Sequence, residues 1–306
     1  MKGLLFLIGC PRSGKTTTHD ILASSGKFAW ISNLQRSYPR KGSLSILNRK
    51  YDIPLFGLRA YAKKKRTDLT APVQGNDFWK HHIPSFELER FEDAVPLEKR
   101  RPPGLKTGDE IPQEHEERTK KAVRDICKWQ GKDHFLSEYA LWSRMNFFTS
   151  IFPKAKFVHV VRDGRAVAHE YRKMIEKGIY PEKREMRWWM SGWPRGWREE
   201  YEENFDSLLA FCAFQWKFIL KMIWDDSKYI SEDRYLEIRY EDMVEDPEFV
   251  FSDILEFYGM DLVPRIERYI ERITLEKQDT IKELDDRDIG VLDEILREGR
   301  YAEYLG

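Results

Sequence analysis

The sequence predicts an α/β fold, with a central parallel sheet flanked by helices and covered in part by a loop-rich cap. Three observations predict it. Short apolar runs typical of buried strands, such as residues 4–8 and 156–161, alternate with longer segments of helical periodicity. A glycine-rich loop joins the first run to a helix. Strands separated by helices need crossover connections, which give a parallel sheet covered on both faces.

The first strand is predicted over residues 4–8, and a phosphate-binding pattern follows it directly. Residues 9–17, GCPRSGKTT, satisfy G-x-x-x-x-G-K-[ST], and a helix is predicted over residues 16–25. The backbone N–H groups and the positive end of the helix dipole are expected to face an anion. Lys15 adds a point charge and Arg12 a planar fork. The sequence therefore predicts a P-loop-like sheet that binds a phosphate-like group at its first loop.

The later helices are predicted from their start and stop signals. Pro112 opens and Gly131 ends one helix, Pro153 closes the next, and Gly178 and Gly259 follow two others. Residues 199–224 have apolar side chains at helical spacing and are expected to form one long helix. The full set of predicted later helices is 112–131, 141–152, 164–177, 199–224, 246–258 and 288–297.

The remaining strands are predicted over residues 134–136, 156–161 and 235–240, because each is short, rich in apolar or β-branched residues, and bounded by polar residues. Residues 27–110 are irregular, and many glycines and prolines interrupt them. We expect this segment to be loops and short helices that cover a site. The basic run 63–66 within it is either a solvated face or an anion patch on the acceptor side.

Composition limits the possible partners. The 306 residues include 52 Lys and Arg and 52 Asp and Glu, so no global positive field favours nucleic acid or an anionic membrane. The three cysteines are far apart, which favours free thiols and a cytoplasmic protein. No apolar run approaches the roughly 20 residues of a spanning helix, so no integral membrane segment is expected. We expect residues 1–306 to form a single domain.

Further cations are expected at the same edge of the sheet. Arg162 and Arg165 follow the strand predicted over residues 156–161. Tyr240 closes the strand predicted over residues 235–240. Ligands of open parallel sheets bind beyond the carboxyl ends of the strands. Both arginines are therefore expected to face the crevice that holds the first loop.

At these three segments the chain resembles sulfotransferases that use 3′-phosphoadenylyl sulfate (PAPS), including bacterial members related to protein-tyrosine sulfotransferases. Residues 11–14 with the following threonines resemble the family's 5′-phosphosulfate loop. Residues 152–166 are similar to its 3′-phosphate segment, and residues 239–248 to its third shared block. The three blocks occur in the family's order.

The resemblance implies a role for each motif residue. Arg12 and Lys15 would stabilise charge during in-line sulfuryl transfer from PAPS, with no metal required. Arg162, helped by Arg165, would clamp the 3′-phosphate, and Tyr240 would pack near the adenine. The residues implied in holding the phosphosulfate are Arg12, Ser13, Gly14, Lys15, Thr16 and Thr17.

The chain departs from the family pattern at several positions. Glu170 stands where the family usually has a serine in the cofactor-binding 3′-phosphate segment. A carboxylate beside a phosphate is unfavourable, so Glu170 either turns away or its contact is replaced by another group. Lys15 replaces a threonine, which creates the kinase-like pattern. Ser137 stands near the place of a lysine that many members carry.

The general base is not defined by the motifs. Related enzymes have a glutamate where this chain has Asn33. His81 and His82 are the favoured candidates to take the acceptor proton, ahead of Asp109 and Glu110. Each histidine could equally be a surface or hydrogen-bonding residue.

The tryptophan-rich segment 185–198 is predicted to be irregular. It is either a loop packed on the domain or a lid over the acceptor pocket, where flat aromatic faces would suit a sugar, lipid or aromatic acceptor.

Three functions fit the sequence. The leading one is a cytoplasmic PAPS-dependent sulfotransferase acting on a small-molecule, carbohydrate or lipid hydroxyl. The second is a P-loop kinase that uses ATP and magnesium on a small molecule. The third is a PAPS-binding module without activity. The sequence defines neither the acceptor nor the oligomeric state.

Overall fold

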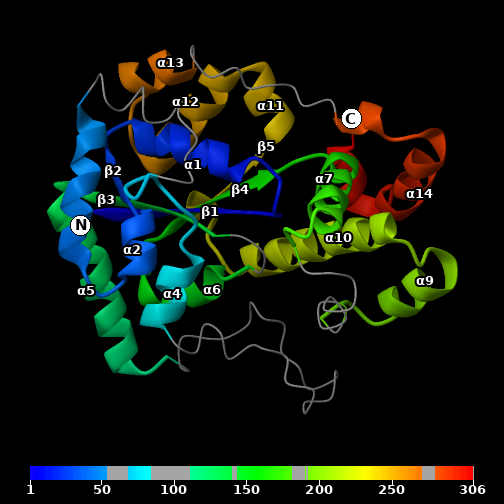
Figure 1. The fold of residues 1–306 in the computed structure, drawn as a ribbon, viewed down its shortest axis with the longest axis horizontal. Helices are drawn as coiled ribbons and strands as arrows, with labels where there is room; N and C mark the ends of the chain where they lie inside the picture. Colours follow the sequence, from blue (N-terminus) through cyan, green and yellow to red (C-terminus); the bar gives the residue numbers. More distant parts are fainter. Residues whose placement is uncertain are drawn as a thin grey trace.

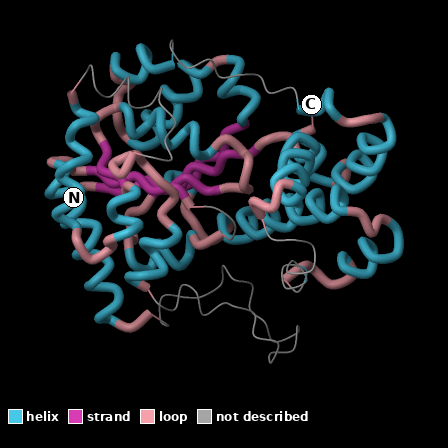
Figure 2. Tube along the Cα trace, in the orientation of Figure 1, coloured by secondary structure: helices cyan, strands magenta, loops and turns pink. Residues whose placement is uncertain are grey.

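The computed structural model describes residues 1–53, 68–83, 111–139, 143–180, 190, 192–270 and 280–305. Within these ranges, helices enclose a twisted sheet at the centre of the molecule (Figures 1 and 2).

In the described part of the chain, five parallel strands form one sheet in the order β2-β3-β1-β4-β5. The strands are β1 (Gly3–Ile8), β2 (Phe28–Trp30), β3 (His134–Glu138), β4 (Lys156–Val161) and β5 (Tyr235–Arg239). Central β1 lies between β3 and β4, so the chain leaves β1 toward one edge and later crosses to the other side. The carboxyl end of β1 is therefore the switch point where open parallel sheets bind ligands.

The helices are α1 (Lys15–Ser24), α2 (Asn33–Ser37), α4 (Asn76–His82), α5 (Gln113–Gln130), α6 (Met145–Ile151), α7 (Gly164–Glu176), α9 (Trp197–Asn204), α10 (Leu208–Ser227), α11 (Tyr240–Glu245), α12 (Pro247–Tyr258), α13 (Pro264–Ile270) and α14 (Asp286–Leu296). The described residues also form the 3-10 helices η1 (Gly42–Asp52), η6 (Glu232–Arg234), η7 (Thr280–Glu283) and η8 (Gly299–Tyr304).

The two faces of the sheet bury separate apolar layers. Leu4, Phe6 and Ile8 of β1 pack with α4, α5, α6, α7, α10 and α14. Leu5 and Leu7 pack on the other face with α1, α11, α12 and α13, which lie together at the top of Figure 1. Because alternate side chains of β1 are buried in different layers, the strand cannot shift by one residue without exposing apolar groups. The position of the loop that follows Ile8 is fixed in the same way.

Most sequence predictions of elements are confirmed. Helices α1, α5, α7 and α12 and strands β1, β3, β4 and β5 begin and end within two residues of their predicted ranges. Strand β3 is longer than predicted, because the structure adds Ser137 and Glu138 at its carboxyl end. The helix predicted over residues 141–152 begins at Met145, and residues 140–142 lie outside the described ranges.

The single long helix predicted over residues 199–224 is wrong. The chain breaks into α9 and α10, because Asp206 has a φ of 27° and cannot continue a helix. Ser207 then starts α10 by accepting a hydrogen bond from the Ala210 N–H with its hydroxyl. Apolar spacing persists across the break, which is why periodicity alone did not reveal it.

Two further predictions need correction. In the described part of residues 27–110, the helices α2, η1 and α4 agree with the short helices expected there, but the strand β2 was not predicted. Tyr240 does not end a strand but is the first residue of α11, which turns its side chain out of the sheet. The basic run 63–66 lies outside the described residues.

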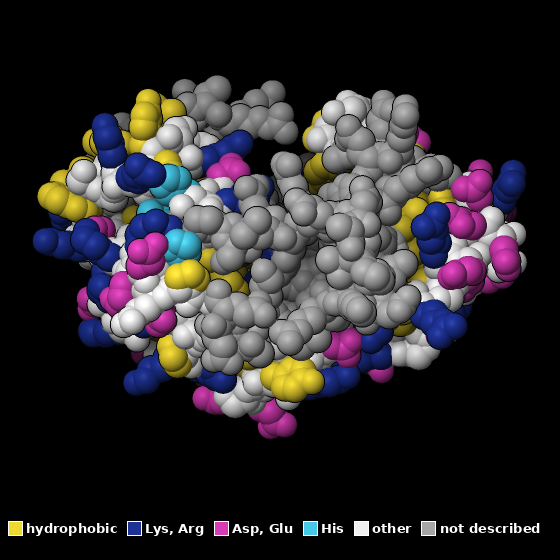
Figure 3. All heavy atoms as spheres, turned by 90° about the horizontal axis from the view of Figure 1, so that it is seen from below, with side chains coloured by type: hydrophobic (Ala, Val, Ile, Leu, Met, Phe, Trp, Pro, Cys, Tyr) yellow, Lys and Arg dark blue, Asp and Glu magenta, His cyan; other side chains and the backbone are white. Residues whose placement is uncertain are grey.

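One face of the molecule is drawn with its side chains in Figure 3. Among the side chains coloured in Figure 3, basic and acidic groups are interspersed rather than gathered by sign, in keeping with equal numbers of each. The described helices include none with the length and apolar character needed to cross a bilayer.

Asp246 caps the amino end of α12, and substituting it tests how much this cap stabilises the protein. Its carboxylate accepts a hydrogen bond from the Phe249 N–H and so caps α12. Asp246→Ala is expected to lower the free energy of unfolding by about 1 kcal/mol, measured by urea denaturation. The exposed Asp253 in the middle of α12 is the matched control, and Asp253→Ala is expected to change stability by less than about 0.5 kcal/mol. Equal effects of the two substitutions would contradict the capping role.

Candidate functional site

The loop after β1 is shaped by two glycines. Gly9 and Gly14 have φ angles of 138° and 96°, a region that side chains strongly disfavour. A Cβ atom on Gly9 would lie 2.5 Å from the Val160 carbonyl oxygen, and one on Gly14 would lie 2.2 Å from Cδ2 of Tyr240. The loop is therefore packed against β4 and α11 so closely that only glycine fits at either position.

Gly14 is also the N-cap of α1 and brings no side-chain cap to it. The first turn of α1 contains no acidic residue, so the positive end of the helix dipole is not neutralised from within the helix. The Ser13 hydroxyl, in a residue only 1% exposed, has no hydrogen-bond partner among the described residues. A buried polar group without a partner is costly, and a bound anion would satisfy it.

Lys15 lies inside the loop. Its ammonium donates hydrogen bonds to the carbonyl oxygens of Gly9 and Cys10, at 2.7 and 2.5 Å. Burial lowers the pKa of Lys15 to about 8, although nearby Glu138 counteracts part of this shift. The side chain thus braces the loop and places one positive charge beneath it.

Glu138, at the carboxyl end of β3, is the functional candidate that sequence reasoning missed. It is 4% exposed, and its carboxylate accepts a hydrogen bond of 2.8 Å from the hydroxyl of Thr16. Its own carbonyl oxygen accepts a bond from the Gly75 N–H, just before α4. The sequence did carry a signal: an acidic residue two positions after the apolar pair Phe135-Leu136, just beyond a strand predicted to end at residue 136.

Arg12 is joined to Glu170 by an ion pair of 2.7 Å. Burial alone would raise the pKa of Glu170, but the bond and charge of Arg12, with a contribution from Lys173, hold this pKa below its usual value. Glu170, which stands where the resembling family has a serine, therefore does not turn away from the loop. Its carboxylate contacts Arg12 of the loop.

Arg162 joins β4 to the loop. Its guanidinium donates a 3.1 Å hydrogen bond to the Arg12 carbonyl oxygen and a 3.2 Å bond to the Thr280 hydroxyl. The same group lies over the ring of Tyr240, 4.7 Å from its centroid. Segments some 80 to 150 residues apart in the sequence thus meet at one point, as the sequence predicted for Arg162 and the loop.

Arg165 has a different environment. Its guanidinium is bonded to Asp163 at 2.7 Å and lies 3.5 Å from Asp293, while Asp163 also caps α7. The Asp163 bond and charge raise the pKa of Arg165 against the opposing effect of burial. These contacts direct Arg165 toward α14, and its predicted help in a 3′-phosphate clamp stays a prediction. Thr17 follows Thr16 in the first turn of α1, where its backbone N–H is among those expected to face an anion.

The two histidines predicted as bases lie at the carboxyl end of α4. His81 accepts a hydrogen bond of 3.1 Å from Arg40, and the Nε2 atom of His82 lies 3.1 Å from the Pro39 carbonyl oxygen. Burial lowers the pKa of both histidines, that of His82 to about 4, so both are neutral near pH 7. The amino end of α4, not this end, adjoins Glu138, and the catalytic role of His81 and His82 stays a prediction. Asp109 and Glu110 lie outside the described residues.

The tryptophan-rich segment is described only in part. Trp193 is 5% exposed, stacks on Phe214 and donates a hydrogen bond of 3.2 Å to Gln215 of α10. This indole is therefore packed on the body of the protein. Trp188 and Trp189 lie outside the described residues.

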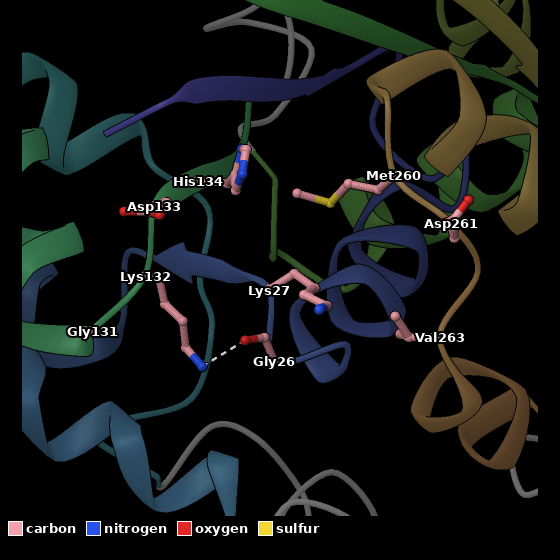
Figure 4. A pocket seen from close by; sticks show the side chains of 9 residues that line it. All are labelled: Gly26, Lys27, Gly131, Lys132, Asp133, His134, Met260, Asp261 and Val263. Carbon is pink, nitrogen blue, oxygen red and sulfur yellow. Dashed lines mark hydrogen bonds between the residues drawn. The ribbon is translucent and has the colours of Figure 1, made fainter.

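A separate crevice of about 490 Å³ lies at the opposite edge of the sheet, beside the amino ends of β2 and β3 (Figure 4). Its lining mixes Lys27, Asp133, His134 and Asp261, and Lys132 there donates a hydrogen bond to the Gly26 carbonyl oxygen. Because it is far from the carboxyl ends of the strands, it is not part of the loop site.

The chain is similar to known proteins in sequence and in fold. The model of a family described as "Sulfotransferase family" matches residues 5–264. The structure is similar to sulfotransferase STF1 from Mycobacterium tuberculosis H37Rv, with 14% identity and a TM-score of 0.57, over 96% of this chain and 76% of that one. It is also similar to sulfotransferase STF9 from Mycobacterium avium, with 14% identity and a TM-score of 0.54, over 99% and 76% of the two chains. A search of curated protein sequences gives no match.

Gly14 tests the packing of the loop. A Cβ atom there would meet the Tyr240 ring in addition to straining the backbone. Gly14→Ala is expected to lower the free energy of unfolding by about 2–4 kcal/mol. Gly259 has a similar φ of 88° but open space around it, so Gly259→Ala is expected to cost only about 1 kcal/mol. The close approach of Tyr240 would be refuted if guanidinium denaturation gave the two variants the same stability.

Proposed function

The chain belongs to the sulfotransferase family, and from this premise we propose that it transfers a sulfuryl group from PAPS to a hydroxyl acceptor. It is a transferase enzyme, and the alternative of an ATP-dependent kinase is not favoured, because the family match spans the loop of residues 9–17, residues 152–166 and residues 239–248.

The position of Arg162 carries the proposal. Its guanidinium reaches the backbone of the loop from the end of β4 and covers the ring of Tyr240. An adenosine donor with phosphate groups at two positions needs cations at two points and a flat surface between them. Arg12 and Lys15 provide the first point, and we propose that Arg162 provides the second with Tyr240 beside the adenine.

The loop residues fit the 5′ end of such a donor. The uncapped first turn of α1 offers backbone N–H groups of Lys15, Thr16 and Thr17, and the buried hydroxyl of Ser13 lacks a partner. The glycine backbone lets an oxyanion approach where a Cβ atom would not fit.

In the proposed reaction the acceptor oxygen forms a bond to sulfur while the bond from sulfur to the phosphate oxygen breaks. The nucleotide 3′-phosphoadenosine 5′-phosphate (PAP) leaves with the bonding electron pair. Negative charge grows on the leaving phosphate, where the fixed N–H groups and Lys15 stabilise it. Arg12 contributes further charge when the ligand competes with Glu170 for its guanidinium. We keep His81 and His82 as predicted acceptors of the hydroxyl proton.

The acceptor is proposed to be a small-molecule, carbohydrate or lipid alcohol that binds between the loop and the segment 27–110, with residues 185–198 as a lid, all within one domain. A cytoplasmic location is proposed because the three cysteines are buried free thiols.

The proposed function is tested by ligand-dependent stabilisation and by turnover. PAP is expected to raise the melting temperature of the wild type more than ADP with magnesium does, since stabilisation follows affinity. Arg162→Ala is expected to weaken PAP binding about 100-fold by calorimetry, the loss of one charge-assisted bidentate contact. PAPS is expected to yield PAP in the presence of a panel of phenols, sugars and alkanols. Stronger stabilisation by ADP with magnesium, or no release of PAP with any acceptor, would reject the function.

Glu170 tests how the site accepts an anion. Because its carboxylate pairs with Arg12, it competes with a phosphate-bearing ligand for that guanidinium. Glu170→Gln is expected to tighten PAP binding roughly threefold to tenfold, as expected for removal of a partly exposed ion pair.

Glu283→Gln is the matched control for Glu170. Glu283 contacts His169 and Lys173 on the same helix but not Arg12. The Glu283→Gln substitution removes the same charge from the same region, and the PAP affinity of this variant is expected to stay within about twofold of the wild type. Weaker PAP binding by Glu170→Gln would mean that the carboxylate positions Arg12 for the ligand instead of competing with it.

A further inference from the structure

Tyr180 lies beside the loop, and its hydroxyl is not used by the fold. The residue follows α7 and is half-buried, and its hydroxyl makes no hydrogen bond within the described part of the chain. We propose that this hydroxyl donates a hydrogen bond to an oxygen of the sulfuryl group while the group is transferred. The inference rests on the proposed function and adds one catalytic residue to it.

The first support is the way the chain folds back after α7. Gly178 has a φ of 66° and lets the chain turn at the end of the helix. The N–H groups of Ile179 and Tyr180 then both donate to the carbonyl oxygen of Met174, at 2.9 and 3.2 Å. These bonds hold the Tyr180 ring over α7, where its centroid lies 4.9 Å from that of the Tyr171 ring.

The adjacent residue of α7 holds the loop arginine. Glu170 directly precedes Tyr171 and forms the 2.7 Å ion pair with Arg12. Arg12 and Tyr180 therefore contact neighbouring residues of one helical turn. Burial raises the pKa of Tyr180, and the charge of Arg12 opposes this shift while that of Glu138 adds to it. The hydroxyl thus lies at the mouth of the loop, on the side of Arg12 and Glu138.

The second support is the direction of the proposed donor in the site. Arg162 and Tyr240 belong to the side of the sheet formed by β4 and β5, so the adenosine is placed on that side of the loop. In PAPS the 5′-phosphate joins the adenosine to the sulfuryl group. With this phosphate in the loop, the sulfuryl group extends the opposite way, toward β3 and Glu138. Tyr180 lies on the same side.

An independent observation indicates that a ligand oxygen belongs beside Arg12. Its Nε atom is buried and has no hydrogen-bond partner among the described residues, although its Nη2 atom is bonded to Glu170. A buried donor without a partner is costly, and an oxygen of a bound anion would satisfy it. Other oxygens of the same group would then be available to the hydroxyl of Tyr180.

The chemistry of the transfer gives this hydrogen bond its effect on rate. As the acceptor oxygen approaches sulfur and the phosphate oxygen leaves, negative charge is spread over the equatorial sulfuryl oxygens, as in phosphoryl transfer. A fixed donor directed at those oxygens lowers the barrier. Tyr180 can donate without losing its proton, because burial raises its pKa. The ionised carboxylates of Glu138 and Glu170 only accept hydrogen bonds and cannot replace it.

The test compares two nucleotides that differ only in the sulfuryl group. PAPS and PAP are each titrated by calorimetry into the wild type and into Tyr180→Phe, which keeps the ring and removes the hydroxyl. PAPS binding is expected to weaken by about tenfold, as for the loss of one hydrogen bond to a charged group. The affinity for PAP, which has no sulfuryl group, is expected to stay within about twofold. The kcat for PAP release, measured with the best acceptor of the panel of phenols, sugars and alkanols, is expected to fall by about tenfold to 100-fold.

Tyr171→Phe is the matched control, because it removes a hydroxyl from the same pair of rings. Tyr171 is 3% exposed, and burial raises its pKa together with the thiols of Cys10 and Cys212. Its hydroxyl therefore faces the interior of the protein. Both nucleotide affinities and the kcat of this variant are expected to stay within about twofold of the wild type. Retained PAP binding by Tyr180→Phe shows that this variant is folded.

The outcomes separate the two proposals. A fall in kcat with unchanged PAPS affinity would support a contact formed only in the transition state. Equal losses of PAPS and PAP affinity in Tyr180→Phe would overturn the sulfuryl contact, and so would unchanged PAPS affinity together with unchanged kcat. Either of these results would leave the sulfotransferase function standing, provided that the wild type releases PAP from PAPS. A wild type that binds ADP with magnesium more tightly than PAP would reject PAPS as the donor, and the role of Tyr180 with it.

Discussion

The contact between Gly14 and Tyr240 is the constraint on which the site depends. It exists because residue 14 has no side chain, so that the first residue of α11 can lie against the loop. Tyr240 in turn supports the guanidinium of Arg162, which is bonded to the loop backbone. Three segments from the beginning, middle and later part of the chain are held by one aromatic ring. A larger residue at position 14 would separate them all.

Within that frame the site is electrically compensated before any ligand binds. Arg12 faces Glu170, Lys15 lies near Glu138, and Arg165 is bonded to Asp163. Such pairs keep buried cations from destabilising the empty protein, because an unpaired charge in a low-dielectric site is costly. When an anion binds, each cation must therefore exchange its carboxylate partner for the ligand. The affinity of an anion then depends on how readily the carboxylates give up their cations, as well as on the number of cations present.

The sequence predicted the parts of the fold that depend on local signals. The loop of residues 9–17, the apolar strands and the helix ends at Gly131 and Gly259 all follow from short-range chemistry, and the structure has them. The break at Asp206 was not predictable from periodicity, because apolar spacing continues across it. The short strand β2 was missed since its pairing with β3 joins residues about 100 apart.

In the site too, some features follow from local sequence signals and others depend on tertiary contacts. The position of Arg162 near the loop follows from the rule that ligands bind beyond strand ends, and it is found there. The partners of Arg165 and the histidines depend on which side chains other elements bring to them, and spacing in the sequence carries no such information. Glu138 was overlooked because the strand was predicted to end at residue 136, whereas pairing with β1 extends it to the carboxylate itself. Tertiary pairing therefore decides which polar residues belong to the site.

The buried ammonium of Lys15 has a consequence for how the enzyme would meet its ligand. With a pKa of about 8 in the empty loop, part of the population carries this side chain neutral in mildly alkaline solution. An arriving anion favours the charged form, so the lysine draws a hydrogen ion from the medium as the complex forms. Heat released on association would then vary with the ionisation enthalpy of the buffer. The protein would act as a small proton sink each time its loop fills.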